Sequence, residues 1–237
     1  MSLFLFCIGC DQSSWNNPYP HEESDKLIYY DSFSERPKHL DPVSSYSSNE
    51  YIFLGQIYEP LLQYHFLKRP YELVPLTANN IPKPIYSDKN GGILPETAPE
   101  ENIDTIKYRI SIKPGILFQP HPAFAKDKNG SFLYHDLDEN DLNKIYTLAD
   151  FNVLGSRELQ ASDYIYQIKR MSHPRVHSPI SGLMKKYILG LDELSKELNS
   201  LYSSDSSSGY LNLHDYSLSG VNLIDKYTFE ITLKEKY

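Results

Sequence analysis

Between residues 106 and 112 the chain alternates apolar and polar side chains. An extended chain places successive residues on opposite faces, so this segment is predicted to be a half-buried β-strand. The Pro114-Gly115 pair predicts a turn after it, because proline fixes φ and glycine accepts the reversed backbone. The apolar run 116–118 is expected to bring the chain back from that turn. The residues on the expected buried face are Ile106, Tyr108, Ile110 and Ile112.

A helical period appears earlier in the chain. From Asn49 to Tyr64 the apolar residues recur at intervals of three and four, which predicts an amphipathic helix. Ser48 or Asn49 is expected to cap it, since a short polar side chain can accept from the first free N–H groups. Pro60 is expected to end or kink this helix at Glu59.

A second helix is predicted to begin at Ser162, the expected cap. Asp163 would lie at its positive N-terminus and Lys169 and Arg170 in its last turn, so charges at both ends suit the helix dipole. The spacing of the apolar residues gives one stripe along the helix. That stripe contains Tyr164, Ile165, Ile168 and Met171.

The remaining pattern is a mixture of strands and loops. Residues 27–33 and the end of 219–237 are predicted to be strands, and 71–84 a loop. The Asn-Gly pair within 88–92 predicts a tight turn, and the polar stretch 203–209 a flexible loop. Strands and helices together place the chain in the mixed α/β (α+β) class.

Composition indicates a folded protein. The chain has 237 residues, of which 40% are hydrophobic and 23% charged, a balance typical of a globular core. Its 20 tyrosines suit either strands or an adaptable binding cleft, and both interpretations stay open. The net charge of −8 and pI of about 5.5 argue against nucleic acid as a partner, because proteins that bind nucleic acids present a basic surface.

Both cysteines lie in the first ten residues. Residues 1–10 resemble the end of a bacterial lipoprotein signal, with Cys10 as the residue that would be lipidated and Cys7 three positions before it. A frayed apolar terminus and a CxxC metal or redox pair are the alternatives. Residues 11–26 are predicted to be a flexible tether. Asp11 resembles the signal that retains some lipoproteins in the inner membrane.

The sequence lacks the common catalytic and metal-binding motifs. The sequence contains no HExxH, GxSxG, Walker A or GxGxxG pattern, so no enzymatic activity, metal or cofactor is expected. The acidic run 136–141 is interpreted as a solvated loop. A calcium loop starting at Asp136 would need glycine and glutamate where the chain has Asp141 and Thr147. The scattered histidines, interpreted as structural, include His121, His135, His173, His177 and His214.

A series of segments, in this order, resembles the extracellular solute-binding proteins of ABC importers in the oligopeptide- and dipeptide-binding family (family 5). They read LIYYDSFSERPKHLDP, IYEPLLQY, ELVPLTAN, YRISIKPGILFQP and SRELQASDYIYQIKRM. In that family a first strand leads to a Leu-Asp-Pro loop and a helix ending in Tyr-Glu-Pro-Leu-Leu. A strand and a Pro-Gly or Asp-Gly corner then precede a helix that opens with Ala-x-Asp. The order and spacing of the segments carry the resemblance.

The resemblance implies a type II periplasmic-binding fold. Residues 27–48 would begin its first lobe, and residues 49–237 would form the accessory domain of that lobe. Where the family has a short turn this chain has residues 121–156, an insertion that indicates an enlarged subgroup. Members of the family are usually more than twice this long, so the chain is expected to be the N-terminal part, with the second lobe outside it.

The function implied is the capture of peptides or similar solutes in the periplasm and their delivery to an ABC permease. The protein would act as a monomer, anchored to the inner membrane only through lipid on Cys10, and would close two lobes on a hinge. In the family the loop after Leu-Asp-Pro runs along the cleft. The candidate ligand contacts are therefore Ser44, Ser45, Tyr46 and Ser47.

Two alternatives remain open at this stage. On the first alternative, the loop that carries the candidate contacts is a plain surface loop that binds no ligand, since most loops are exposed. On the second alternative, the protein is a secreted lipoprotein that uses the same fold for another purpose, either as an enzyme or as a chaperone-like interaction protein. The insertion 121–156 suggests this second alternative.

Overall fold

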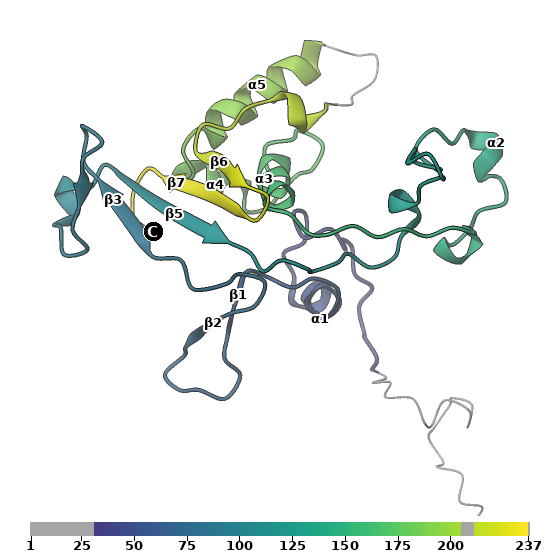
Figure 1. Ribbon diagram of the computed structural model, residues 1–237, viewed down its shortest axis with the longest axis horizontal. Coiled ribbons are helices and arrows are strands. Elements are labelled where there is room, and N and C mark those ends of the chain that lie inside the picture. The colour runs from purple at the N-terminus through teal and green to yellow at the C-terminus, as the bar shows by residue number, and fades with distance from the viewer. Residues whose placement is uncertain (1–30, 205–210, 237) are drawn as a thin grey trace, which may run out of the picture. The chain divides into compact units, whose positions relative to one another are not determined.

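The computed structural model describes residues 31–204 and 211–236 (Figure 1). Within the chain, Pro37–Tyr237 groups into one unit, and the residues before it lie outside that unit. Among the described residues, none of the helices has the length and apolar character needed to cross a bilayer. The predicted signal 1–10, with Cys10, the predicted tether 11–26 and residues 27–30 of the predicted strand lie outside the described residues. Residues 31–33, the described end of that predicted strand, are not in a strand.

Strands form two antiparallel sheets. The larger has five strands in the order β4-β3-β5-β7-β6, and the smaller pairs β1 with β2. The strands of the larger sheet are β3 (Pro84–Ser87), β4 (Ile93–Leu94), β5 (Thr105–Ser111), β6 (Val221–Asp225) and β7 (Thr228–Leu233). Those of the smaller sheet are β1 (Leu62–Tyr64) and β2 (Leu73–Pro75).

Helices complete the structure, which confirms the mixed α+β class. The helices are α1 (Ser48–Ile57), α2 (Glu139–Leu142), α3 (Ala161–Arg170), α4 (Ser181–Tyr187) and α5 (Leu191–Ser204). Single 3-10 turns occupy Glu100–Asn102, Pro122–Phe124, Leu148–Asp150 and Leu213–Asp215. Figure 1 shows α3, α4 and α5 on one side of the larger sheet.

The alternating segment is the central strand β5, as predicted. Ile106, Ile110 and Ile112 are 1%, 6% and 0% exposed, and Tyr108 is half-buried. On the polar face Arg109 donates to Glu230 of β7 at 2.9 Å. Both faces of the strand are therefore occupied, the apolar face by the core and the polar face by ion pairs.

The turn after β5 is confirmed, but the return is not. Gly115 has φ 81°, a left-handed conformation that glycine adopts without steric cost. The apolar run that follows does not pair back onto β5. Instead Leu117 bridges Glu158, and the N–H of Phe118 donates to the carbonyl of Arg157 at 3.0 Å. A distant segment, not a local hairpin, takes up these backbone groups.

The core lies between the larger sheet and α3 and α5. Leu191, Leu194 and Leu198 recur at helical spacing along α5 and are 0%, 2% and 0% exposed. Phe229 of β7 is 0% exposed and stacks on Tyr164 of α3, with ring centroids 5.6 Å apart. The predicted stripe of α3 packs against this core along its whole length.

The first helix is shorter than predicted. α1 ends at Ile57, with Tyr58 in extended conformation, and its cap is Ser47, not Ser48 or Asn49. Pro60 lies beyond the end, and residues 62–64 form β1 instead of a last helical turn. Their partner β2 lies within the segment predicted to be a loop. Extended pairing between these two segments outweighs the helical spacing of Leu61 and Leu62.

The start of α3 also differs from the prediction. Gln160 is the N-cap, not Ser162, and it forms a capping box with Asp163. The Asp163 carboxylate accepts the N–H of Gln160 at 2.9 Å and binds Arg157 in a bidentate pair. Lys169 and Arg170 lie in the last turn, as predicted.

Two further predictions concern turns. Residues 88–92 form the expected tight turn, in which the Asp88 side chain accepts from Asn90 and Gly92 at 2.8 Å. Residues 219–237 contain the expected strands as the β6–β7 hairpin. Of the polar stretch 203–209, Ser203 and Ser204 belong to α5, and the rest lies outside the described residues.

The insertion 121–156 begins and ends at one place. His121 and Gly155 exchange two backbone hydrogen bonds, of 2.8 and 3.1 Å. Gly155 lies so close to the Phe124 backbone that a Cβ atom there would overlap its carbonyl oxygen. Between these ends lie two 3-10 turns and the short helix α2. The insertion is therefore an arm with a closed base.

Candidate functional site

The loop after Asp41-Pro42 is fixed from within and from α3. The carbonyl of Asp41 accepts the N–H groups of Ser44 and Ser45 at 3.0 and 2.9 Å. Its carboxylate accepts the N–H of Val43 at 3.1 Å and holds both terminal nitrogens of Arg170. Burial raises the pKa of Asp41, but the hydrogen bonds from Arg170 and from the Val43 N–H, together with the charge of Arg170, lower the pKa overall.

Glu50 of α1 holds the other side of the same loop. Its carboxylate is buried, with the residue 3% exposed. It accepts the Ser45 hydroxyl at 2.7 Å, which is the largest reason that the pKa of Glu50 falls to about 2. The further donors are the N–H groups of Lys38, His39, Tyr46 and Ser47, at 2.9 to 3.4 Å. One buried carboxylate therefore organises residues 38–47.

The structure places the predicted contacts in two classes. The Ser44 hydroxyl donates to the Val176 carbonyl at 2.8 Å, and the Ser45 hydroxyl donates to Glu50. Ser47 forms the capping box with Glu50 at the start of α1. These side chains serve the loop itself. Tyr46 differs, because its side chain is 78% exposed on a loop whose backbone is fixed.

Tyr46 is continuous in sequence with other exposed apolar side chains. α1 has a weak apolar stripe, and its buried residues are Glu50 and Leu54. The outer residues of α1 and its C-cap that are about half exposed or more are Tyr51, Ile52, Ile57 and Tyr58. Tyrosine presents an apolar ring with a polar tip, so this face suits a ligand that is partly apolar and partly polar.

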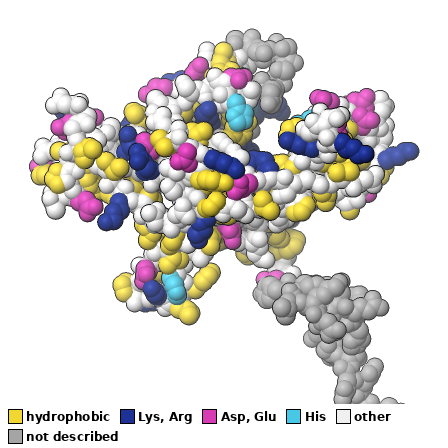
Figure 2. All heavy atoms as spheres, viewed as in Figure 1, with side chains coloured by type: hydrophobic (Ala, Val, Ile, Leu, Met, Phe, Trp, Pro, Cys, Tyr) yellow, Lys and Arg dark blue, Asp and Glu magenta, His cyan; other side chains and the backbone are white. Residues whose placement is uncertain are grey.

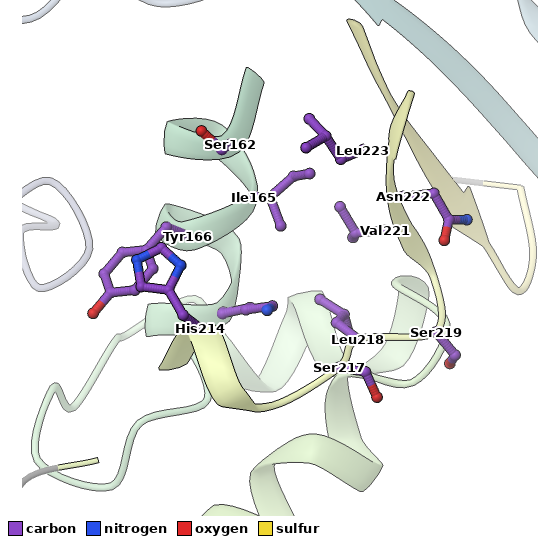
Figure 3. Close-up of a pocket in the computed structure, with 11 residues that line it drawn as sticks. Ser162, Ile165, Tyr166, His214, Ser217, Leu218, Ser219, Val221, Asn222 and Leu223 are labelled. Carbon is purple, nitrogen blue, oxygen red and sulfur yellow. The ribbon is translucent and has the colours of Figure 1, made fainter. Parts of the chain in front are cut away.

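A separate hollow of about 370 Å³ lies between α3 and the start of β6 (Figure 3). Ile165 and Val221 line its apolar side, and Tyr166 lies beside the ring of His214 at 4.7 Å between centroids. Lys169 also lines it, but its ammonium donates to the carbonyls of Leu213 and Tyr216. Burial lowers the pKa of Lys169. The hollow is open, and two of the three donors of its ammonium are already taken by backbone carbonyls.

Within the described residues, no three His, Cys, Asp or Glu side chains come together as a metal site would require. In the acidic run 136–141, Asp138 caps α2, and its carboxylate accepts from Asn140 and Asp141. The histidines of the arm also make structural bonds. His121 accepts from Ala123, and His135 stacks on Phe132 at 4.0 Å.

Positive and negative side chains are interspersed on the face shown in Figure 2. Several ion pairs between described residues join separate segments of the chain, as the pair of Lys226 and Glu158 does. A continuous basic field of the kind that follows a phosphate backbone is not visible on that face.

Sequence reasoning missed the two residues that fix the loop. Glu50 carried a local signal, since Ser47 followed three residues later by glutamate is a capping-box pattern. Arg170 carried none. It was assigned to the last turn of a helix, and its partner Asp41 lies 129 residues away.

Comparison with known proteins adds no identity, since no family model and no curated protein matches this chain.

Lowering the pH should destabilise the loop through Glu50. A carboxyl whose folded pKa is about 2, against an ordinary 4.5, contributes stability above pH 4.5 that is lost as pH falls toward 2. We expect the unfolding free energy of the wild type to fall over that window. Glu50→Gln should flatten the fall, and at neutral pH it should expose residues 38–47 to protease. Urea titration at several pH values and limited proteolysis measure both effects.

The matched control is Glu158→Gln. The pKa of Glu158 is also lowered to about 2, by Lys226, the Gly115 N–H and Tyr227, but it lies outside the loop. This variant should also flatten the pH dependence and leave cleavage within 38–47 unchanged. An unaltered pH slope in Glu50→Gln would contradict the assigned role of Glu50.

Proposed function

We propose that this chain is the first-lobe part of a type II periplasmic-binding protein in the oligopeptide- and dipeptide-binding family. It captures peptides in the periplasm and passes them to an ABC permease in the inner membrane. The order of the sequence segments supports this proposal, together with an α+β fold in which they become α1, β5 and α3. Residues 27–48 begin the lobe, and 49–237 form its accessory domain.

The observation that carries the proposal is the arrangement of Tyr46. Glu50 and Asp41 fix the backbone on either side of it, and the neighbouring hydroxyls are taken up internally. The backbone that carries the tyrosine therefore needs no further ordering when a ligand binds, which lowers the entropic cost of binding. Its ring can cover a peptide side chain of any kind while its hydroxyl bonds the peptide backbone.

The proposed mechanism follows from the proposed type II fold. A type II protein closes two lobes on a hinge around its ligand and makes no covalent bond. The second lobe of this protein lies outside residues 1–237 on the resemblance, and it supplies the opposite wall. Cys10, after signal cleavage, anchors the protein, with 11–26 as the tether. No cofactor, metal or nucleic acid takes part, and the protein works as a monomer.

Replacing Tyr46 with alanine should weaken peptide binding by about tenfold or more, since a well-placed aromatic contact accounts for 1.4 kcal/mol or more. The measurement is the thermal shift of the full-length protein, wild type and variant, across a series of di- to pentapeptides. Tyr146→Ala is the matched control, because that tyrosine is 86% exposed on the arm. Equal peptide shifts in wild type and Tyr46→Ala would contradict the assignment.

A second candidate function rests on the arm. Exposed apolar side chains recur along it, a surface typical of protein contacts. Those with the largest exposed fractions are Tyr146, Leu148, Leu154, Phe132 and Leu142. On this alternative the protein is a secreted lipoprotein that binds another protein, or an enzyme, built on the same fold.

The closed base of the arm allows a clean deletion. Because His121 and Gly155 are already hydrogen-bonded, residues 122–154 can be replaced by Asn-Gly without moving the ends. Peptide binding should survive this deletion if the arm is an accessory of a transport protein. Loss of a protein partner or of a turnover, with peptide binding intact, would favour the second candidate.

A further inference from the structure

Residues 65–72 join β1 to β2 and form the free end of that hairpin (Figure 1). We refer to them as the hairpin tip. Two adjacent large apolar side chains lie on it, Phe66 at 82% and Leu67 at 86% exposed. Within Pro37–Tyr237 no described element covers them, although exposing the phenylalanine ring and the leucine methyl groups to water is unfavourable. Two such neighbours at a turn are a localised apolar surface, not scattered exposure.

Part of the backbone of the hairpin tip is hydrogen-bonded from within. Arg69 donates to the carbonyls of Phe66 and Lys68 at 3.3 and 2.8 Å. The N–H of Leu67 donates to Nδ1 of His65 at 3.2 Å, and the N–H of His65 donates to the Glu72 carbonyl at 2.8 Å. Polar backbone groups enter an apolar medium only if they are already bonded. Beside the two apolar side chains, the carbonyl of Phe66 and the N–H of Leu67 already have such partners.

The charges of the hairpin tip are opposite in sign to those of the protein as a whole. Lys68 and Arg69 follow the apolar pair directly, with Glu72 as the single carboxylate, in a chain of net charge −8. The Lys68–Glu72 pair of 2.9 Å has both side chains about half exposed, so the ammonium keeps access to a second anion. Arg69 lies over the Tyr71 ring at 4.4 Å.

Tyrosines lie on both sides of the apolar pair. Tyr64 at the end of β1 and Tyr71 before β2 meet edge to face, with ring centroids 5.7 Å apart. They are 60% and 69% exposed. Aromatic rings with a polar tip favour the headgroup region of a bilayer, next to apolar residues that reach the acyl chains and cations that meet phosphates. The hairpin tip combines all three classes within a few residues.

We propose that the hairpin tip is a membrane-contact site for an anionic lipid surface. Phe66 and Leu67 enter the boundary of the acyl chains, while Lys68 and Arg69 lie against lipid phosphates. The bilayer is favoured over a protein partner by the charge complementarity between the two cations of the tip and lipid phosphates, and by flanking tyrosines of the kind found in the headgroup region. The sequence alone predicts one membrane contact, the lipid on Cys10. The hairpin tip would be a second. It does not depend on peptide binding.

The test is co-sedimentation of the full chain with vesicles of phosphatidylcholine containing phosphatidylglycerol, and with vesicles of phosphatidylcholine alone. Phe66→Ser/Leu67→Ser should lower the partition coefficient on anionic vesicles by about tenfold or more. Lys68→Gln/Arg69→Gln should lower it by about fivefold per cation on anionic vesicles and leave neutral vesicles unchanged. The N-terminal segment is common to all variants, so differences between them report the hairpin tip.

Ile93→Ser is the matched control, because Ile93 is 79% exposed at a different turn. It should partition as the wild type does. Equal partitioning of Phe66→Ser/Leu67→Ser and wild type would overturn the proposal, and so would a loss equally large in Ile93→Ser. Circular dichroism of each variant verifies that it is folded.

A second measurement does not rely on loss of binding. Phe66→Trp should show a blue shift of its fluorescence on anionic vesicles, because the indole leaves water for the interface. The spectrum of the wild type, whose single tryptophan is Trp15, is subtracted. Tyr146→Trp on the arm should show no shift. An unshifted spectrum for Phe66→Trp, or a tip captured by a protein partner and not by vesicles, would overturn the lipid assignment.

Discussion

Replacing Phe229 with alanine should lower the free energy of unfolding by about 3–5 kcal/mol, the usual cost of removing a buried phenylalanine. The side chain is 0% exposed and stacks on Tyr164, at the centre of the core between β7 and α3. Its removal leaves a cavity that α3, fixed at both ends by Arg157 and Arg170, cannot collapse to fill. The free energy of unfolding of a domain is about 5–15 kcal/mol, so this substitution would remove a large part of it.

Urea unfolding followed by circular dichroism measures this cost. The matched control is Phe66→Ala, because that phenylalanine is 82% exposed at the hairpin tip. It should change the free energy of unfolding by less than about 0.5 kcal/mol, as exposed substitutions do. A loss below about 1 kcal/mol for Phe229→Ala would show that the sheet and α3 do not form one core.

Replacing Gly220 with alanine should cost about 1–3 kcal/mol or more, the range for overpacking a close contact. Gly220 is buried at the start of β6, and a Cβ atom there would overlap the backbone carbonyl of Leu189. Its own carbonyl accepts the N–H of Thr232 at 2.7 Å, and Thr232 accepts the N–H of Leu189 at 3.0 Å. The segments around residues 189, 220 and 232 therefore meet at one point. None of them can move away to make room for a Cβ atom without breaking one of these hydrogen bonds.

Gly182→Ala is the control for Gly220→Ala. Gly182 lies in α4 with nothing within 4 Å of the position a Cβ would take. Alanine there should be neutral or stabilising by about 0.5–1 kcal/mol, since it restricts the unfolded chain more than glycine does. Equal melting temperatures for the two variants would contradict the close approach of residues 189 and 220.

The sequence predicted elements best where one local pattern decides the outcome. β5 followed from the alternation at 106–112, because every apolar position of that pattern faces the core. The end of α1 was predicted wrongly, because Leu61 and Leu62 continue a helical spacing although they lie in and beside β1. What decides there is pairing with β2, a contact between segments that no local pattern encodes.

The candidate site shows the same division. Residues 44–47 are candidates because the matching loop of the resembling family runs along the cleft, yet Glu50 and Val176 take up two of their hydroxyls, and Tyr46 remains exposed. The Ser47–Glu50 capping box was readable from the sequence. The Asp41–Arg170 pair was not, since the two residues become neighbours only when α3 packs beside the loop.

The central claim is that Tyr46 and the loop around it belong to a peptide-binding lobe. Calorimetric titration of di- to pentapeptides into the full-length protein, which on this proposal includes a second lobe, tests it most directly. We expect saturable binding of one peptide per protein, with the negative heat-capacity change of apolar burial. The 237-residue chain alone should bind weakly or not at all, because one lobe offers one wall of a cleft. Failure of every peptide and comparable solute to bind the full-length protein, or equal affinity for the 237-residue chain, would contradict this account.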